Sequence, residues 1–146
     1  VDLPPEEEGE FTPALAEAGV DLIRLATPTS DDARLDVILK QASGFLYYVS
    51  VLGVTGGLSA EQNAIAAAVA RLRRKTDLPL AIGFGIKQPD QAAAAARAAD
   101  AAVGGTAQCE TIADHLDADG WPQDGLVDAV LGQTRALAQA IRGTAA

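Results

Sequence analysis

The sequence predicts an α/β fold built on a parallel sheet. Short runs rich in β-branched and aliphatic residues alternate with longer amphipathic segments, and three short runs end in the glycine-containing sequences Gly-Val-Thr-Gly, Gly-Phe-Gly and Gly-Gly-Thr. Strands that alternate with helices form right-handed βαβ units, in which the strands run parallel. Because parallel strands end at the same edge of a sheet, we expect the three glycine loops to lie side by side.

The first half of the chain is expected to contain two helices and two strands. Thr12 favours a helix start as its N-cap, Pro13 fits the first helical position, and Gly19 ends this helix. Asp31 and Asp32 lie in the first turn of the next helix, where acidic residues complement the helix dipole. The expected elements are a helix over 12–19, a strand over 20–26, a helix over 29–41 and a strand over 45–51.

The second half is expected to continue the same alternation. Ser59 and Gln62 have the spacing of a capping box and predict the start of a helix. Glycines follow the next two apolar runs and favour strand ends there. The expected elements are helices over 59–75 and 89–98, strands over 78–82 and 99–103, a short helix that follows the Gly-Gly-Thr loop and ends near 116, and a last helix over 124–141.

Composition limits the class of protein. The 146 residues suit one soluble globular domain, with 49% apolar residues and a mean hydropathy of +0.13. The net charge of −9 opposes nucleic-acid binding, and the basic cluster at 71–75 is expected to be a solvated helix end. The sequence has no run long enough to cross a bilayer and its first residues lack signal-peptide features, so no membrane association and a cytoplasmic location are expected.

Metal binding and an internal disulfide are not expected. The chain has one cysteine, Cys109, and one histidine, His115, which cannot make a zinc-ligand cluster. Cys109 is expected on an apolar helix face, as a small buried residue.

Five segments carry a resemblance to a known family. The runs DLPPEE, LIRLATPTSDDARL, GFLYYVSVLGVTG and IGFGIKQP, and the ending from HLDADG to AIRG, resemble the tryptophan synthase alpha subunit in the same order. The resemblance implies a (β/α)8 barrel that splits indole-3-glycerol phosphate into indole and glyceraldehyde 3-phosphate by a retro-aldol reaction without a cofactor. It also implies a partner, the pyridoxal-phosphate-dependent beta subunit.

The resemblance covers the later portion of the barrel. A whole barrel takes about 250 residues, so residues 1–146 are expected to form a single partial domain, the C-terminal half with four parallel strands and flanking helices, without the first strands. The family's catalytic glutamate and aspartate belong to the second strand and the loop after it, outside this portion. Glu6, Glu7 and Glu8 match a different acidic segment and are expected in a solvated first turn.

Two positions match catalytic residues of the family. Tyr47 matches an active-site tyrosine whose hydroxyl lies near the catalytic carboxylate, and Thr55 matches a threonine that contacts the aspartate when its loop closes over substrate. From the residues alone, strand packing is the favoured interpretation of Tyr47, and a flexible polar loop is an alternative for Thr55.

A second group matches the substrate-binding residues. Glycine lets backbone N–H groups approach a phosphate closely, and a threonine hydroxyl adds a hydrogen bond. An aromatic residue before the second glycine of Gly-Phe-Gly is expected to line the indole pocket. The expected substrate-binding and phosphate-binding residues are Phe45, Gly56, Phe84, Gly85, Gly105 and Thr106. Gln108 and Cys109 stand where the family has apolar residues.

Three functional hypotheses follow. The first is an alpha-type lyase polypeptide that carries the phosphate-binding half of the site. The second is a noncatalytic half-barrel that binds phosphate or serves in assembly. The third, another phosphate-binding barrel such as an indole-glycerol-phosphate synthase or phosphoribosyl isomerase, is less favoured because those barrels lack the Gly-Val-Thr-Gly loop after a tyrosine-bearing strand. Exposed sheet edges also predict self-association.

Overall fold

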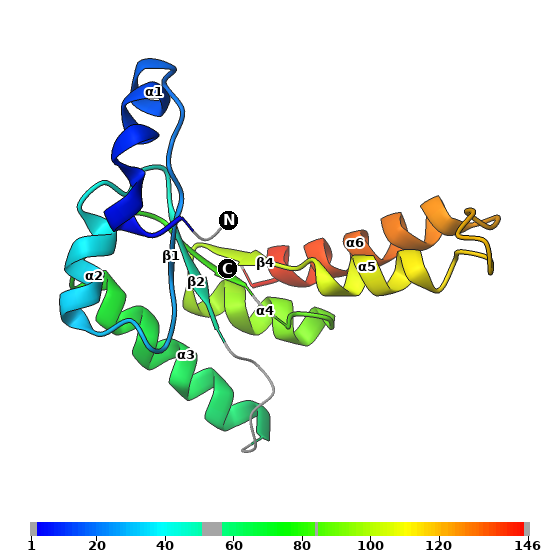
Figure 1. Ribbon diagram of the computed structural model, residues 1–146. Coiled ribbons are helices and arrows are strands. Elements are labelled where there is room, and N and C mark those ends of the chain that lie inside the picture. The colour runs from blue at the N-terminus through cyan, green and yellow to red at the C-terminus, as the bar shows by residue number, and fades with distance from the viewer. Residues whose placement is uncertain (1–2, 51–56, 84, 145–146) are drawn as a thin grey trace.

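The computed structural model describes residues 3–50, 57–83 and 85–144. Within these ranges a 3-10 helix, η1, is followed by alternating α-helices and strands (Figure 1). In chain order the elements are η1 (Pro5–Glu10), α1 (Thr12–Glu17), β1 (Arg24–Ala26), α2 (Asp32–Leu39), β2 (Leu46–Val49), α3 (Gly57–Arg73), β3 (Leu80–Gly83), α4 (Pro89–Ala98), β4 (Ala101–Val103), α5 (Thr106–Ala113) and α6 (Leu126–Arg142).

The four strands form one parallel sheet in the order β1-β2-β3-β4. Leu25 of β1 lies opposite Tyr47 of β2, Tyr47 lies opposite Ala81 of β3, and Ala81 lies opposite Ala101 of β4. Helices α2, α3 and α4 connect successive strands. The predicted α/β fold with parallel strands is confirmed.

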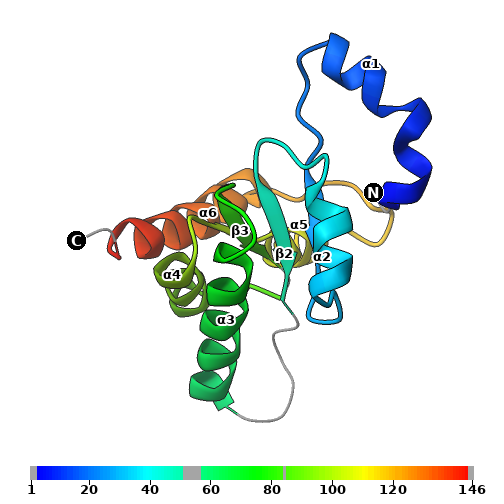
Figure 2. The same ribbon diagram turned by 90° about the vertical axis from the view of Figure 1, so that its left-hand side faces the viewer.

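One face of the sheet carries the hydrophobic core. Leu46, Leu80 and Ile82 point to this face, and each has 0% of its surface exposed. Helices α2, α3, α4 and α6 cover them with apolar side chains, and Figure 2 shows α3 and α4 close to β3. Complete burial of a side chain of this size contributes roughly 1.5 to 3 kcal/mol. This face therefore holds the helices to the sheet.

The opposite face of the sheet is less covered. Side chains alternate across a strand, so Tyr47 and Val49 point away from the core, and both are only partly buried. Val103 of β4 shares this face and is 37% exposed. We call this the inner face; its residues are Leu25, Tyr47, Val49, Ala81, Gly83, Ala101 and Val103.

Helices α5 and α6 form a hairpin that projects from the sheet (Figure 1). The Thr111 hydroxyl donates a hydrogen bond of 3.0 Å to Gln133 Oε1 across the pair. Trp121, at the tip of the hairpin, is 70% exposed. Cys109 is exposed, so its predicted burial is wrong. Cys109 lies on the side of α5 that faces solvent, so no other element of the described chain buries it.

The strands are shorter than predicted or shifted. β1 covers only the end of the predicted range 20–26, because its ladder begins where Arg24 pairs with Leu46. Val20, ahead of the ladder, is 54% exposed. β2 begins at Leu46, so Phe45 lies just before the strand and not in it. Apolar patterns continue beyond the paired residues, which is why they misplace strand ends.

Helix starts also differ from prediction. Helix α2 covers only part of the predicted range 29–41, because the Asp31 side chain caps its start by accepting the Arg34 N–H at 2.8 Å. The N-cap of α1 is Phe11, and the Thr12 hydroxyl instead donates a hydrogen bond of 3.1 Å to the Glu8 carbonyl. Helix α3 begins at Gly57, so Ser59 lies inside the helix and the predicted capping box is wrong. Helix α4 has the predicted boundaries.

Glu8 is buried, although it was expected in a solvated turn. Only 6% of Glu8 is exposed, and its carboxylate forms an ion pair with Arg24, which is 4% exposed. Glu6 and Glu7 are exposed, as predicted. A buried arginine without a partner charge is strongly unfavourable. The pair therefore ties η1 to the start of β1.

Candidate functional site

The carboxyl ends of β2, β3 and β4 meet at one edge of the sheet, because the strands are parallel neighbours in register. Tyr47 lies two residues before the end of β2, and Gly85 lies two residues after the end of β3. Gly105 and Thr106 follow the end of β4 by two and three residues. The structure thus brings these four predicted residues to the same edge, which we call the strand-end site.

The Tyr47 ring lies directly over Gly83 of the neighbouring strand. A Cβ atom added to Gly83 would be 1.9 Å from the Tyr47 Oη and 2.4 Å from its Cζ. No side chain fits at position 83 while Tyr47 keeps this position. This role of Gly83 cannot be predicted from its own segment, because the side chain that requires a glycine lies on another strand.

Gly85 has a backbone conformation that favours glycine. Its φ angle is 75°, in the left-handed region that other residues rarely adopt. Close by, a Cβ atom added to Gly104 would be 3.4 Å from the Ile86 carbonyl oxygen. The loop after β3 and the loop after β4 therefore touch, and Gly85 and Gly105 belong to adjoining loops.

Gly105 is the N-cap of α5, and Thr106 is the first residue of the helix. The Cys109 N–H donates to the Gly105 carbonyl at 3.0 Å, while the N–H groups of the first turn have no partner within the helix. Gly105 has a φ of −138°, and an added Cβ would meet nothing within 4 Å. The Cβ direction at Gly105 therefore points away from the described chain, beside a helix start of the kind that can bind an anion.

A lysine lies next to this helix start. Lys87 Nζ forms an ion pair with Glu110 of α5, and the two side chains are 44% and 53% exposed. An exposed pair of this kind contributes less than about 1 kcal/mol. Glu110 therefore offsets the charge of Lys87, and the first-turn N–H groups and dipole of α5 remain as the positive end of the helix.

The chain was compared with protein families and with individual proteins. Residues 1–137 match the family model described as tryptophan synthase alpha chain. Curated relatives of that name from Gluconacetobacter diazotrophicus and Granulibacter bethesdensis are each 51% identical over 142 residues. The chain belongs to the tryptophan synthase alpha chain family. It spans about half the length of these relatives, since the match covers 97% of this chain and 52% or 51% of theirs.

Solved structures of tryptophan synthase alpha chains share the fold. The alpha chain from Legionella pneumophila superposes with a TM-score of 0.77 at 32% sequence identity, over 97% of this chain and 50% of that one. A tryptophan synthase structure from M. tuberculosis gives a TM-score of 0.77 at 28% identity, over 97% of this chain and 48% of that one. The predicted fold class is confirmed: four parallel strands with flanking helices that correspond to about half of a (β/α)8 barrel.

Not every position matched to tryptophan synthase alpha chains can be located. Thr55, Gly56 and Phe84 lie outside the described residues. Phe45 shares the inner-face orientation of Tyr47 but precedes β2, so it lies toward the amino end of that strand and away from Gly85. Phe45 therefore lies two residues before Tyr47 on the same face, farther from the carboxyl end of β2.

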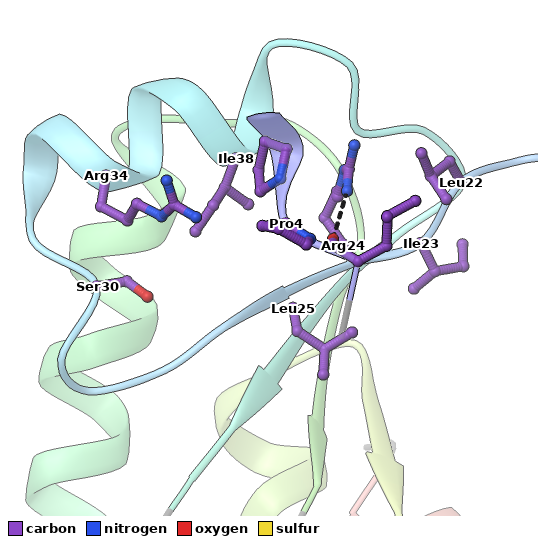
Figure 3. Close-up of a pocket in the computed structure, with 10 residues that line it drawn as sticks. Pro4, Leu22, Ile23, Arg24, Leu25, Ser30, Arg34 and Ile38 are labelled. Carbon is purple, nitrogen blue, oxygen red and sulfur yellow. Dashed lines mark hydrogen bonds between the residues drawn. The ribbon is translucent and has the colours of Figure 1, made fainter. Parts of the chain in front are cut away.

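A pocket of about 270 Å³ lies elsewhere, between the N-terminal segment, β1 and α2 (Figure 3). Arg24 and Arg34 line it, and Arg24 donates a hydrogen bond of 3.3 Å to the Leu3 carbonyl. Arg24 pairs with Glu8 and Arg34 with Glu6, and burial lowers the pKa of Arg24. Both arginines of this pocket are thus paired with glutamates, which offset their charge.

Across residues 3–50, 57–83 and 85–144, no three His, Cys, Asp or Glu side chains are grouped so that they could hold a metal ion. Among the helices in those same ranges, none combines the length and apolar character needed to span a membrane.

Proposed function

We propose that this chain is the phosphate-binding portion of a tryptophan synthase alpha-type lyase, which cleaves indole-3-glycerol phosphate to indole and glyceraldehyde 3-phosphate. One observation carries the proposal. Three neighbouring strands of a family member present Tyr47, Gly85 and Gly105 at one edge, with an open helix N-terminus beside them. Barrel enzymes commonly bind phosphate with the last two strand-end loops and a helix start of this kind.

In this proposal the chain holds the substrate by its phosphate. The N–H groups of Gly85, Gly105 and Thr106 donate to the phosphate oxygens, and the Thr106 hydroxyl adds a further donor. Gly56 contributes from the loop after β2. Phe84 and Phe45 supply aromatic surface for the indole ring. Indole-3-glycerol phosphate is therefore the proposed ligand of this chain.

The chemistry needs groups at the other end of the substrate. In a retro-aldol cleavage a base removes a hydroxyl proton while an acid protonates the departing carbon, and carboxyl groups perform both tasks in the family. The proposal places these carboxyl groups on the part of the relatives that this chain does not span. Tyr47 hydrogen-bonds near them, Thr55 meets them when its loop closes, and no cofactor takes part.

The test is complementation. The chain is mixed with the other half of the Gluconacetobacter diazotrophicus relative, and indole release from indole-3-glycerol phosphate is measured. We expect release from the mixture and none from either half alone. Gly105→Asp should abolish release, because a carboxylate fills the anion space above α5. Tyr47→Phe should lower kcat/KM by about two- to ten-fold, the value of one hydrogen bond.

A matched control is available on the same strand. Tyr48 is buried on the core face, with 7% of its surface exposed, so Tyr48→Phe should leave indole release unchanged. A folded complex that releases no indole would contradict the lyase and favour a noncatalytic phosphate-binding module. Release that Gly105→Asp does not affect would place the phosphate elsewhere.

A tryptophan synthase beta subunit is the proposed protein partner. The support is family membership, since the M. tuberculosis neighbour is a tryptophan synthase. The complemented barrel should bind a beta subunit from the same source as the complementing half and co-elute with it in size-exclusion chromatography. Separate elution at micromolar concentrations would argue against this partner.

A further inference from the structure

Ser50 is a buried polar residue that follows the last residue of β2. It is 3% exposed and lies on the core side of the sheet. Its hydroxyl donates a hydrogen bond of 3.2 Å to the Gly83 carbonyl, and its backbone N–H donates to the same oxygen at 3.0 Å. Because the N–H bond alone would satisfy this carbonyl, the hydroxyl bond is an additional constraint on Gly83.

The Tyr47 phenol ring packs over Gly83. The position that a Cβ atom of Gly83 would occupy lies 1.9 Å from the Tyr47 Oη. A shift of the Gly83 backbone would therefore change the contact that holds the Tyr47 hydroxyl in place. Gly83 also ends β3, two residues before Gly85. Gly83 therefore contacts Tyr47 and also leads directly into the loop after β3, which contains Gly85.

We infer that Ser50 is a positioning residue, whose buried hydroxyl bond to Gly83 sets the Tyr47 phenol at a fixed place relative to the phosphate loop at Gly85. The inference rests on the proposed function, because it assigns Tyr47 to the reacting end of the substrate and Gly85 to its phosphate. Reaction rates depend steeply on this kind of placement. Ser50 itself touches no substrate.

The chain allows a direct measurement of the phenol. Its two tyrosines are Tyr47 and Tyr48, so labelling with 3-fluorotyrosine gives two fluorine resonances, which Tyr47→Phe and Tyr48→Phe assign. Ser50→Ala should shift or broaden the Tyr47 resonance and leave that of Tyr48 in place. Addition of inorganic phosphate should shift the Tyr47 resonance in the unmodified chain and shift it less in Ser50→Ala.

Two variants separate positioning from general stability. Ser50→Thr keeps a hydroxyl and should restore the Tyr47 resonance. Ser30→Ala removes another buried serine, 7% exposed, whose Oγ accepts the Thr27 N–H at 3.1 Å on a different loop. Ser30→Ala should leave the Tyr47 resonance unchanged. In the complemented enzyme, Ser50→Ala should lower kcat by about three-fold or more, as expected for one lost hydrogen bond.

The inference is overturned if Ser50→Ala leaves the Tyr47 resonance where it is, or if Ser30→Ala moves it equally. This result needs neither substrate nor the other half of the barrel. An absence of indole release would thus count against the proposed function, and an unmoved Tyr47 resonance against the role of Ser50.

Discussion

At the residue scale, the glycines of the strand-end site are required for different reasons. Gly85 is needed for its φ of 75°, and Gly83 for the Tyr47 ring that lies over it. Gly105 has neither constraint, since its φ is negative and nothing of the described chain lies within 4 Å of an added Cβ. In the proposed function, Gly105 is required because its backbone N–H group approaches the phosphate.

Gly83→Ala should displace Tyr47 without unfolding the sheet. The new methyl group meets the far end of the Tyr47 side chain, which can rotate away, so the cost in stability is of order 1 to 3 kcal/mol. A double-mutant cycle measures this coupling: in a Tyr47→Ala background, Gly83→Ala should cost much less. Equal costs in both backgrounds would show that the Tyr47 ring does not lie over Gly83.

Asp100 gives the fold a defined acid sensitivity. Its carboxylate accepts the Leu80 N–H at 2.7 Å and pairs with Arg73, and both interactions hold the pKa of Asp100 below its ordinary value of 3.8. A carboxyl group whose pKa is lower in the folded state than in the unfolded state stabilises the fold at pH values above its unfolded-state pKa. This stabilisation is lost as the pH falls through the folded-state pKa.

The matching experiment is urea unfolding of Asp100→Asn at two pH values. Because Asp100 is partly exposed and screened, the variant should lose about 0.5 to 1 kcal/mol of unfolding free energy at pH 7. At pH 3 the two proteins should become more alike. Asp77→Asn, at an exposed position nearby, is the control. An equal difference at both pH values would contradict the assigned role of Asp100.

At the element scale, the two faces of the sheet contribute unequally. The core face buries Leu46, Leu80 and Ile82 completely under four helices, whereas the inner face leaves Val103 37% exposed. Hydrophobic stabilisation scales with the apolar area removed from water. The stability of the described chain therefore comes mainly from the core face.

This difference predicts the cost of truncating side chains on neighbouring strands. Ile82→Ala should cost about 2 to 5 kcal/mol, because it leaves a cavity in a closely packed core. Val103→Ala should cost less than about 1 kcal/mol, because Val103 is already partly in water. Chemical denaturation measures both values. Similar losses for the two variants would mean that the inner face is also covered in solution.

The order and type of the strands and most helices could be predicted from periodicity. An amphipathic run buries its apolar side as a helix on the sheet, and a short apolar run is buried as a strand within the sheet. Strand ends could not, since they depend on where partners pair: Arg24 begins β1 only because Leu46 lies opposite. The burial of Glu8 was also missed, because its partner Arg24 lies in a different segment of the chain.

For the candidate site, the sequence identified the residues that belong to contiguous glycine motifs, such as Gly85 and Gly105. It missed Gly83 and Ser50, whose roles depend on the register between β2 and β3. A pattern within one segment cannot reveal a contact across two strands. The glycine after an apolar run, opposite a strand that carries a tyrosine, is the signal that could have identified Gly83.

At the scale of the whole molecule, the chain corresponds to about half of a closed barrel. Its inner face is apolar, and β1 and β4 are the outer strands of the described sheet. Backbone groups at such edges pair readily with other strands. The same surfaces that would meet the rest of a barrel are therefore available for contacts between copies.

We accordingly expect this 146-residue chain to form dimers or larger assemblies on its own. Size-exclusion chromatography with light scattering should show them, and Val103→Lys, which places a charge on the inner face, should shift the distribution toward monomer. A stable monomer at all concentrations would contradict association through these surfaces.

In the proposed function, the loops after β3 and β4 together bind one anion. This binding is tested most directly by titrating the isotopically labelled chain with glycerol phosphate and following its backbone amides by NMR. We expect saturable shifts at Gly85, Gly105 and Thr106, which Gly105→Asp abolishes. Shifts confined to the pocket around Arg24 and Arg34, or no saturable shifts at the strand-end site, would contradict it.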